Sequence, residues 1–391
     1  MKILYIAHDT TITGAGKALS NIILQLRKEH DIRVLCPSSG GALVDFLKEN
    51  GVIFYFIKYR KTTYPRYNGN PFVYIKKLLG VIYRSYKASS FLEKILKDYR
   101  PDIVHTNTGT LDIALSKCRK LGIPHVWHLR EYQDKDFDLH VIPSKKAWLR
   151  KIHQEGNYNI AITKDIFNYF HLRDVDTYIY DGVFSTENMP IHRSVNKSKY
   201  FLFVGRIEEP KGLYDTLEAF KEVSAKYPDY QYYVAGRIQK YQYYEKCNAF
   251  VVGNHLEEKV IFLGERNDVY ELMAHATALL VPSRCEGFGF ITVEAMLNDC
   301  LVIGRNTGGT KEQFDNGVLW TSNEIGLRYE TKEEFISRML SAIECDYSDM
   351  RTSAKKIVVE KYSQQANAQT LEAYYKRIID NNSTNTGARY F

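Results

Sequence analysis

The chain alternates short apolar, β-rich runs with segments of helical period, and this alternation constrains the fold more than any other feature. Residues 2–8 form the first such run, and 17–30 follow with apolar side chains at a helical spacing. Parallel strands need crossover helices, so the alternation predicts an α/β fold with a doubly wound parallel sheet. The strands expected in the first half are 2–8, 32–36, 53–57, 103–106, 125–129, 158–163 and 177–180.

The alternation stops once and then begins again. Residues 184–199 are polar and aperiodic, which is typical of a linker. Two Rossmann-like domains are therefore predicted, 1–183 and 200–362, with a ligand in the cleft between them. The helix 363–380 is expected to pack back on the N-terminal domain, and 381–391 to form a flexible tail. The strands expected in the second half are 200–204, 230–235, 260–263, 277–281 and 301–303.

The composition fits a soluble globular protein. With 391 residues the chain is long enough for two domains, and its content is 45% hydrophobic and 25% charged. No apolar run reaches the ~18–20 residues that span a membrane, and the first residues suit a core strand better than a signal peptide. The six cysteines are scattered without a CxxC pair, which favours free cytoplasmic thiols over disulfides or a zinc site.

The formal net charge of +7 is concentrated in residues 58–100, where tyrosines and a phenylalanine interleave the lysines and arginines. Basic charge with aromatic side chains suits an anionic membrane surface. The alternative is a solvated helix face with the tyrosines packed beneath it. Nucleic-acid binding is not expected, because no recognised motif accompanies the charge.

Two acidic residues, Glu286 and Glu294, bracket seven residues that follow a short apolar run typical of a buried parallel strand. Gly287 and Gly289 let the backbone turn closely and direct N–H groups outward. A helix beginning near Phe290 would direct its positive end at the same point. Such a site can hold a phosphate on backbone donors while the two acids bind hydroxyls, which predicts a nucleotide-sugar ligand.

A second loop, 205–212, follows the first strand of the second half and contains Arg206 and Lys211. A loop between a strand and a helix can bring two cations to one diphosphate. Arg206 can bind two oxygens at once, and Lys211 supplies a point charge. Taken alone, the same turn could be an ordinary surface loop.

Gly14 and Gly16 lie between the first strand and the first helix. A dinucleotide fingerprint would place a third glycine where Leu19 stands and an acid near Cys36. A nicotinamide or flavin site is therefore disfavoured, and no cofactor is expected. The glycines leave room for a donor phosphate or an acceptor to approach the backbone.

His128 ends a predicted strand beside Arg130 and Glu131. A side chain at the carboxyl end of a parallel strand opens toward the ligand cleft, and the alternative is a structural histidine. Two acidic pairs, 136/138 and 174/176, have the DxD spacing of metal sites but lie in polar, irregular stretches. No metal is expected, because the Arg-plus-Lys pair can neutralise a diphosphate.

Taken in order, these motifs resemble the retaining nucleotide-sugar glycosyltransferases of the GT-B fold, specifically glycosyltransferase family four. Residues 205–212 are similar to the family's G-R-x-x-x-x-K-G, and 286–294 to its E-x7-E with G-F-G and E-A-M. Segments 101–107, 124–132, 179–183 and 307–312 also fit. The glycine loop departs from the pattern, because Ala15 separates glycines that are often adjacent in the family.

The resemblance implies a role for each site residue. Arg206 and Lys211 would neutralise the departing diphosphate, Glu294 would hold the ribose hydroxyls, and Glu286 would hold the transferred sugar. His128 would lie near the donor sugar, and the base near Arg237 and Arg266. The expected catalytic residues are His128, Arg206, Lys211 and Glu286, and the expected donor-binding residues are Gly16, Arg206, Lys211, Arg237, Arg266, Glu286, Gly287, Phe288, Gly289, Phe290 and Glu294.

Together with these motifs, the resemblance implies a metal-independent retaining glycosyltransferase that transfers a sugar, UDP-linked by default, to a glycan or lipid-linked acceptor in cell-surface polysaccharide biosynthesis. It would be cytoplasmic or peripheral on the inner face of the membrane. The alternatives are a sugar-phosphate synthase and a non-catalytic sugar-nucleotide or glycan-binding partner protein of the same fold.

Overall fold

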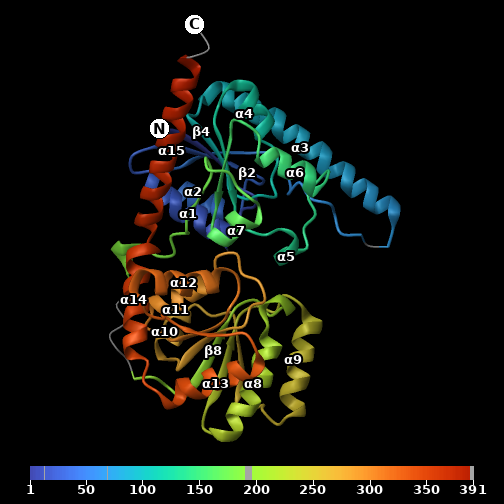
Figure 1. Cartoon of the computed structure of the whole chain (residues 1–391). Helices are drawn as coiled ribbons and strands as arrows, with labels where there is room; N and C mark the ends of the chain where they lie inside the picture. The colour runs from blue at the N-terminus through green and yellow to red at the C-terminus, as the bar shows by residue number, and fades with distance from the viewer. Residues whose placement is uncertain (13, 68, 190–195, 388–391) are drawn as a thin grey trace. The chain divides into compact units, whose positions relative to one another are not determined.

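The computed structural model describes residues 1–12, 14–67, 69–189 and 196–387, and it divides into two compact units (Figure 1). The first unit consists of Met1–Phe184 and Gln364–Phe391, and the second of Ser185–Ser363. Each unit is built around one parallel sheet, of seven and six strands respectively. The predicted fold class, two doubly wound α/β sheets, is confirmed.

The first sheet has the strand order β3-β2-β1-β4-β5-β6-β7. The chain starts in the middle, builds to one edge, and then returns to build toward the other, so the order reverses between β1 and β4. The strands are β1 (Lys2–Ile6), β2 (Asp31–Cys36), β3 (Ile53–Phe56), β4 (Ile103–Thr106), β5 (His125–Leu129), β6 (Asn157–Ala161) and β7 (Thr177–Tyr178). The helices are α1 (Ala15–Leu26), α2 (Ala42–Glu49), α3 (Pro71–Tyr99), α4 (Leu115–Leu121), α5 (Asp134–Phe137), α6 (Lys145–Ile152), α7 (Lys164–Tyr169) and α15 (Gln364–Gly387).

Helices cover both faces of this sheet. Ile3 and Tyr5 of β1 lie in one core cluster with α1, α2 and α15, whereas Leu4 and Ile6 lie in another with α3 and α4. Successive side chains of a strand point to opposite faces, so these two clusters are the two sides of the sheet. This double burial is why the strands are near-continuous apolar runs.

The last helix, α15, is part of the first unit although the whole second unit precedes it in the chain. Leu371, Tyr374, Tyr375 and Ile378 are buried in the core shared with α1. The helix continues through 381–387, which the sequence suggested as a tail, and Asn382 there donates a hydrogen bond to the Tyr158 hydroxyl at 3.0 Å. Packing on the core extends a helix that local polarity alone would not favour. Residues 388–391 lie outside the described residues.

The second sheet has the order β10-β9-β8-β11-β12-β13, which reverses between β8 and β11. Its strands are β8 (Tyr200–Val204), β9 (Gln231–Ala235), β10 (Val260–Gly264), β11 (Ala278–Val281), β12 (Val302–Arg305) and β13 (Leu327–Tyr329). The helices are η1 (Thr186–Asn188), η2 (Glu209–Lys211), α8 (Leu213–Lys226), α9 (Tyr241–Gly253), α10 (Val269–His275), α11 (Phe290–Leu297), α12 (Gly308–Thr321), α13 (Lys332–Glu344) and α14 (Ser348–Lys361).

Two features of the second unit differ from expectation. The strand β13 was not predicted, because three residues are too few to show a periodic pattern, and it forms by pairing with β12. The predicted linker 184–199 contains the short 3₁₀ helix η1, and its residues 190–195 lie outside the described residues. Among the described residues, every helix is too short or too polar to cross a bilayer.

Candidate functional site

The loops at the carboxyl edge of the second sheet carry most of the predicted site residues. Arg206 and Lys211 follow β8, and the segment 282–289 follows β11, the two strands between which the strand order reverses. In open α/β sheets ligands bind at this point, because the two adjoining loops diverge and leave a crevice. The predicted cations and the predicted acidic loop therefore lie side by side.

The loop after β8 is held against the loop after β11. The Arg284 amide donates to the carbonyl of Pro210 at 3.0 Å. Gly212 has φ of 72°, and a Cβ on it would lie 2.5 Å from the Pro282 carbonyl oxygen. Glycine at this position permits the close backbone approach, which places the Lys211 side chain beside the neighbouring loop.

Lys211 and Glu286 form an ion pair, with 2.6 Å between Nζ and Oε1. The Ser283 hydroxyl donates to the same oxygen at 2.8 Å. Both charged side chains are largely buried, with 21% of Lys211 and 15% of Glu286 exposed. The residue expected to bind phosphate and the residue expected to hold the sugar therefore neutralise each other in this structure.

The helix α11 begins at Phe290, as predicted, and a glycine precedes its first turn. Its N-cap is Gly289 with φ of 82°, so the cap has no side chain to accept from the first helical N–H groups. The Gln313 side chain donates to the Phe288 carbonyl at 2.6 Å and holds the turn. A helix start of this kind offers backbone donors and a positive dipole to a phosphate.

The loop after β12 closes one side of this turn. The Gly309 amide donates to the Glu286 carbonyl at 2.9 Å. A Cβ on Gly308 would lie 2.5 Å from that same oxygen, and one on Gly309 would lie 2.2 Å from the Phe288 carbonyl oxygen. The two glycines after β12 are therefore explained by contact with the Glu286 loop.

Glu294 lies one turn into α11 and is buried. Its carboxylate accepts a hydrogen bond from the Tyr270 hydroxyl at 3.2 Å. Burial, and then the charge of Glu294, raise the pKa of Tyr270, so the phenol stays protonated and donates. Tyr270 is thus a partner of the predicted ribose-binding acid that the sequence did not single out.

The remaining arginines of the predicted set lie in ion pairs with nearby acids. Arg206 pairs with Glu208 at 2.8 Å, and Arg266 pairs with Asp268 at 2.5 Å. Arg237, after β9, lies 3.8 Å from Glu265. Arg237 and Arg266 follow β9 and β10, which lie on the other side of β8 from β11 and β12.

Two predicted site residues, Gly16 and His128, belong to the first unit. A Cβ on Gly16 would lie 1.9 Å from the carbonyl oxygen of Thr11, so this glycine is required by contact within its own loop. The His128 side chain is fully buried, whereas the sequence suggested that it opens outward. Its partners are Arg130, two residues further along the chain, and His105 of the neighbouring strand β4.

His128 lies in a buried chain of polar groups. Its Nδ1 is 3.2 Å from a terminal nitrogen of Arg130 and 3.2 Å from His105 Nε2. The other His105 nitrogen is 2.5 Å from the Tyr375 hydroxyl, which is 3.1 Å from the Tyr5 hydroxyl. Tyr375 belongs to α15, so the C-terminal helix supplies one side chain of this hydrogen-bonded series.

These contacts determine where the protons lie. Arg130 can only donate, so His128 Nδ1 must accept and the proton of the neutral ring is on Nε2. Burial, with Arg130 and His105 nearby, lowers the pKa of His128 well below its usual value, which keeps the ring neutral. Nε2 is buried and has no hydrogen-bond partner among the described residues.

Arg130 is anchored on its other side. One terminal nitrogen donates to both carboxylate oxygens of Asp181 at 2.6 Å, and Nε donates to Asn107 at 3.1 Å. The Arg130 and Asp181 side chains are 3% and 2% exposed. The acid Glu131, which the sequence grouped with His128, is also buried.

The acids of the pairs with DxD spacing differ in exposure, since Asp176 is buried whereas Asp138 and Asp174 are exposed. Asp176 is buried and accepts from the Asn159 amide at 2.8 Å and from Arg173 at 3.0 Å. Asp138 lies 3.2 Å from His140, and the side chain of residue 136 lies outside the described residues.

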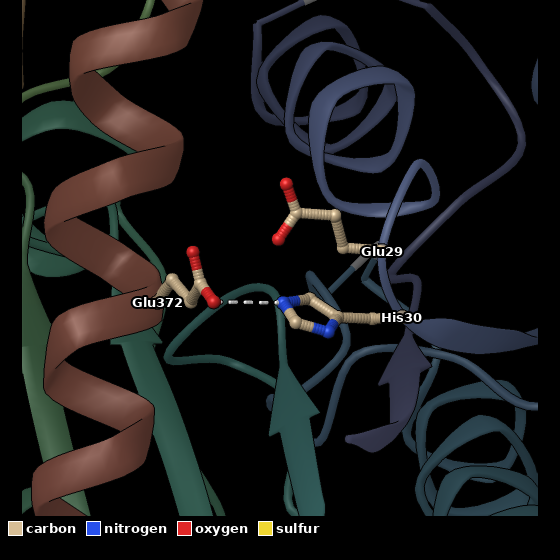
Figure 2. A group of neighbouring side chains, drawn as sticks. All are labelled: Glu29, His30 and Glu372. Carbon is tan, nitrogen blue, oxygen red and sulfur yellow. Dashed lines mark ion pairs between the residues drawn. The ribbon is translucent and has the colours of Figure 1, made fainter.

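Within the described part of the chain, Glu29, His30 and Glu372 have ligand atoms within 4.8 Å of one another (Figure 2). Glu372 Oε1 is 3.2 Å from His30 Nε2 and 2.7 Å from the ammonium of Lys376. Lys376, and then His30, lower the pKa of Glu372. A lysine already neutralises the carboxylate, so the group acts as a tie between α15 and the segment after α1.

Comparison with known structures shows the class of the fold. Anabaena Alr3699/HepE in complex with UDP superposes with a TM-score of 0.77 at 19% identity, covering 96% of this chain and 100% of that chain. This is the GT-B fold of glycosyltransferases.

Two family models match consecutive parts of the chain, Glycosyltransferase Family 4 over residues 12–183 and Glycosyl transferases group 1 over residues 184–358. The chain belongs to glycosyltransferase family four. The uncharacterized glycosyltransferase MJ1178 of Methanocaldococcus jannaschii is 26% identical over 67% of this chain and 74% of its own length. The O-antigen chain mannosyltransferase RfbU of Salmonella typhimurium is 29% identical over 44% of this chain and 52% of its own length.

Proposed function

We propose that this glycosyltransferase is a metal-independent, retaining enzyme that transfers a hexosyl group from a UDP-sugar to a glycan or lipid-linked acceptor in cell-surface polysaccharide biosynthesis. The observation that carries the proposal is the ion pair between Lys211 and Glu286, whose loop leads into the glycine N-cap of α11. A cation, a carboxylate and backbone N–H donors are the groups needed for a diphosphate joined to a sugar.

Donor binding would break the ion pair between Lys211 and Glu286. The diphosphate would take Lys211 and the N–H groups of α11, with Arg206 as a second cation, while Glu286 would turn to the sugar hydroxyls. Glu294, held by Tyr270, would bind the ribose. Backbone atoms of Gly287, Phe288, Gly289 and Phe290 would line the phosphate and sugar, and Arg237 and Arg266 would lie near the base. These separate roles in donor binding would explain why the opposite charges of Lys211 and Glu286 lie next to each other.

Catalysis would rest on stabilising the leaving diphosphate. As the bond from the anomeric carbon to the phosphate oxygen breaks, negative charge grows on that oxygen, and Arg206 and Lys211 offset it. The acceptor hydroxyl would attack from the same face, and its proton would pass to the departing phosphate. The assignments of His128 and Gly16 to the donor site remain proposals from the family resemblance alone, because the His128 side chain is buried within the first unit and Gly16 contacts its own loop.

The acceptor and location form part of the same proposal. The relative from Salmonella acts on an O-antigen chain by its name, which supports a surface-polysaccharide acceptor. All six cysteines are free thiols, and such thiols persist in a reducing compartment. The enzyme would therefore work on the cytoplasmic side, with lipid-linked acceptors reached at the inner face of the membrane.

Donor hydrolysis without an acceptor tests the proposal. The purified protein should release UDP slowly from a matching UDP-sugar, and EDTA should leave the rate unchanged. Lys211→Ala should lower kcat/KM by about 30-fold or more, because losing a partly buried charge partner costs about 2–5 kcal/mol. Lys332→Ala, on the exposed start of α13, is the matched control.

Three outcomes would contradict the proposal. Full activity in Lys211→Ala would remove the diphosphate assignment. Loss of turnover on chelation, restored by Mg²⁺ or Mn²⁺, would show that a metal is needed. An inverted anomeric configuration in the product, read by proton NMR, would exclude retention. Nucleotide-sugar binding without any hydrolysis or transfer would favour the non-catalytic partner, and transfer to a sugar phosphate would favour the synthase.

A further inference from the structure

The helix α3 carries an apolar stripe on its outer side. Phe72, Ile75, Leu79, Ile82 and Tyr86 are spaced by three or four residues, so they lie along one side of the helix. Their exposed fractions run from 48% for Ile82 to 83% for Phe72. A water-soluble helix normally turns such a stripe toward the core.

The core of the first unit uses the other side of α3. The buried residues of the helix are Val81, Ala88, Leu92, Ile95, Leu96 and Tyr99. Val81 is two residues from Leu79, which places it about 200° away around the helix axis. Because five of the six buried positions fall in the second half, that half fixes α3 to the sheet and the first half extends beyond the strands (Figure 1).

The alternative suggested by the sequence, with tyrosines packed beneath a basic face, does not hold for this part of α3. Tyr83 and Tyr86 are 57% and 71% exposed. Aromatic side chains placed outward on a helix, beside aliphatic ones, form a patch of the kind that marks an interaction surface.

The charges around the stripe all have one sign. Residues 58–92 contain no acidic residue and include the cations Lys58, Arg60, Lys61, Arg66, Lys76, Lys77, Arg84 and Lys87. Lys76 and Lys87 each follow a stripe residue directly, which puts them along one edge of it. Lys87 Nζ lies 4.9 Å from the centre of the Tyr83 ring, so its stem covers the aromatic face.

We propose that the first half of α3 docks on an anionic lipid bilayer. The helix lies in the plane of the surface, with Phe72, Ile75, Leu79, Ile82 and Tyr86 entering the boundary between headgroups and acyl chains. The lysines and arginines remain at the level of the lipid phosphates. This docking stands independently of donor chemistry, because it requires no nucleotide.

The positive charge around the stripe favours an anionic bilayer over a second copy of the chain as its binding partner. A twofold interface would bring the same basic segment of both copies together, so like charges would face one another. An anionic bilayer supplies both an apolar layer for the stripe and opposite charge for its edges. Each cation near such a surface strengthens binding about fivefold at physiological ionic strength, and high salt removes this gain.

Sedimentation with vesicles tests the proposal. The full-length protein should bind phosphatidylcholine vesicles that contain phosphatidylglycerol and not vesicles of phosphatidylcholine alone, and binding should fall as salt rises. Leu79→Ser combined with Ile82→Ser should lower binding at least tenfold, and Lys76→Glu with Lys87→Glu should do the same. The matched control is Leu319→Ser, which removes a side chain that is 76% exposed on α12 of the second unit.

A Leu79→Trp variant reports the depth of the stripe. Its fluorescence should shift to shorter wavelength on anionic vesicles, whereas a helix attracted by charge alone would show no shift. Equal binding to both vesicle types, no binding, or an unshifted Trp spectrum would overturn the proposal. So would a dimer in solution that Leu79→Ser with Ile82→Ser dissociates, since the stripe would then be an interface between copies. Unchanged donor hydrolysis in the stripe and lysine variants would show that these substitutions affect vesicle binding and leave the donor site intact.

Discussion

Glu286→Gln is the substitution that tests the coupling of the two charged loops most directly. At 2.6 Å, the attraction between Lys211 and Glu286 is ~6 kcal/mol at an effective dielectric constant of ~20. Most of this is offset because both groups lose hydration on pairing, and pairs of this exposure retain a net of about 1 kcal/mol. When a diphosphate binds Lys211, the ion pair with Glu286 must break, and binding loses this net attraction.

Removing the carboxylate charge should therefore strengthen UDP binding while it weakens turnover. A gain of about 1 kcal/mol corresponds to a Kd about fivefold lower. Glutamine retains an oxygen that can accept from Ser283, so the loop should keep its shape. Turnover should fall because the sugar loses the acid that orients it, whereas UDP carries no sugar.

Calorimetry of UDP binding measures this effect, and Glu324→Gln, which breaks an exposed ion pair with Arg328 elsewhere in the second unit, is the control. In a Lys211→Ala background the gain from Glu286→Gln should disappear, because the competing cation is absent. A UDP affinity reduced by Glu286→Gln to the same extent as by Glu294→Gln would refute the reasoning, since both acids would then bind the nucleotide.

Three further predictions concern the rest of the chain. Tyr375→Phe should leave the fold intact but mix the tautomers of His105, whose Nδ1 loses its hydroxyl partner, and this should be visible as a change in the ¹⁵N shifts of the His105 ring; unchanged shifts would contradict the contact between α15 and that histidine. Glu294→Gln should raise KM with a smaller effect on kcat, because binding lost equally in the ground and transition states leaves kcat unchanged. Glu93, whose hydrogen bonds to Lys117, Lys120 and Lys97 lower its pKa to about 2, should stabilise the protein above pH ~4.5. The Tm difference between the natural protein and Glu93→Gln should vanish as pH falls from ~4.5 toward ~2, and a difference that persists at pH 2 would contradict this assignment.

The sequence was sufficient for the elements whose signals are local. The strands β4, β5 and β8 coincide with their predicted ranges, because short apolar runs between polar turns are easy to delimit. The start of α11 at Phe290 followed from the glycines before it. These signals position the loops after β8 and β11, which is why the second-unit site could be outlined in advance.

Features that depend on distant partners were not predictable. His128 is buried beside His105 and Arg130, and His105 in turn contacts Tyr375, which is 270 positions away from it in sequence. The ion pair between Lys211 and Glu286 joins positions 75 residues apart. A single sequence shows the type of each side chain but not which partner it meets, so the pairing of opposite charges appeared only in the structure.

The position of α15 bears on how the protein is synthesised. The second unit is continuous in the chain, whereas the core of the first unit contains Leu371, Tyr374, Tyr375 and Ile378. While a ribosome makes residues 185–363, α15 has not yet been synthesised, so the apolar surface of the first unit that α15 later covers stays exposed to water. At ~5–20 residues per second this interval lasts on the order of 10–40 s. The second unit can therefore complete its folding first, and the amino-terminal segment, although made earlier, is the one most in need of a chaperone.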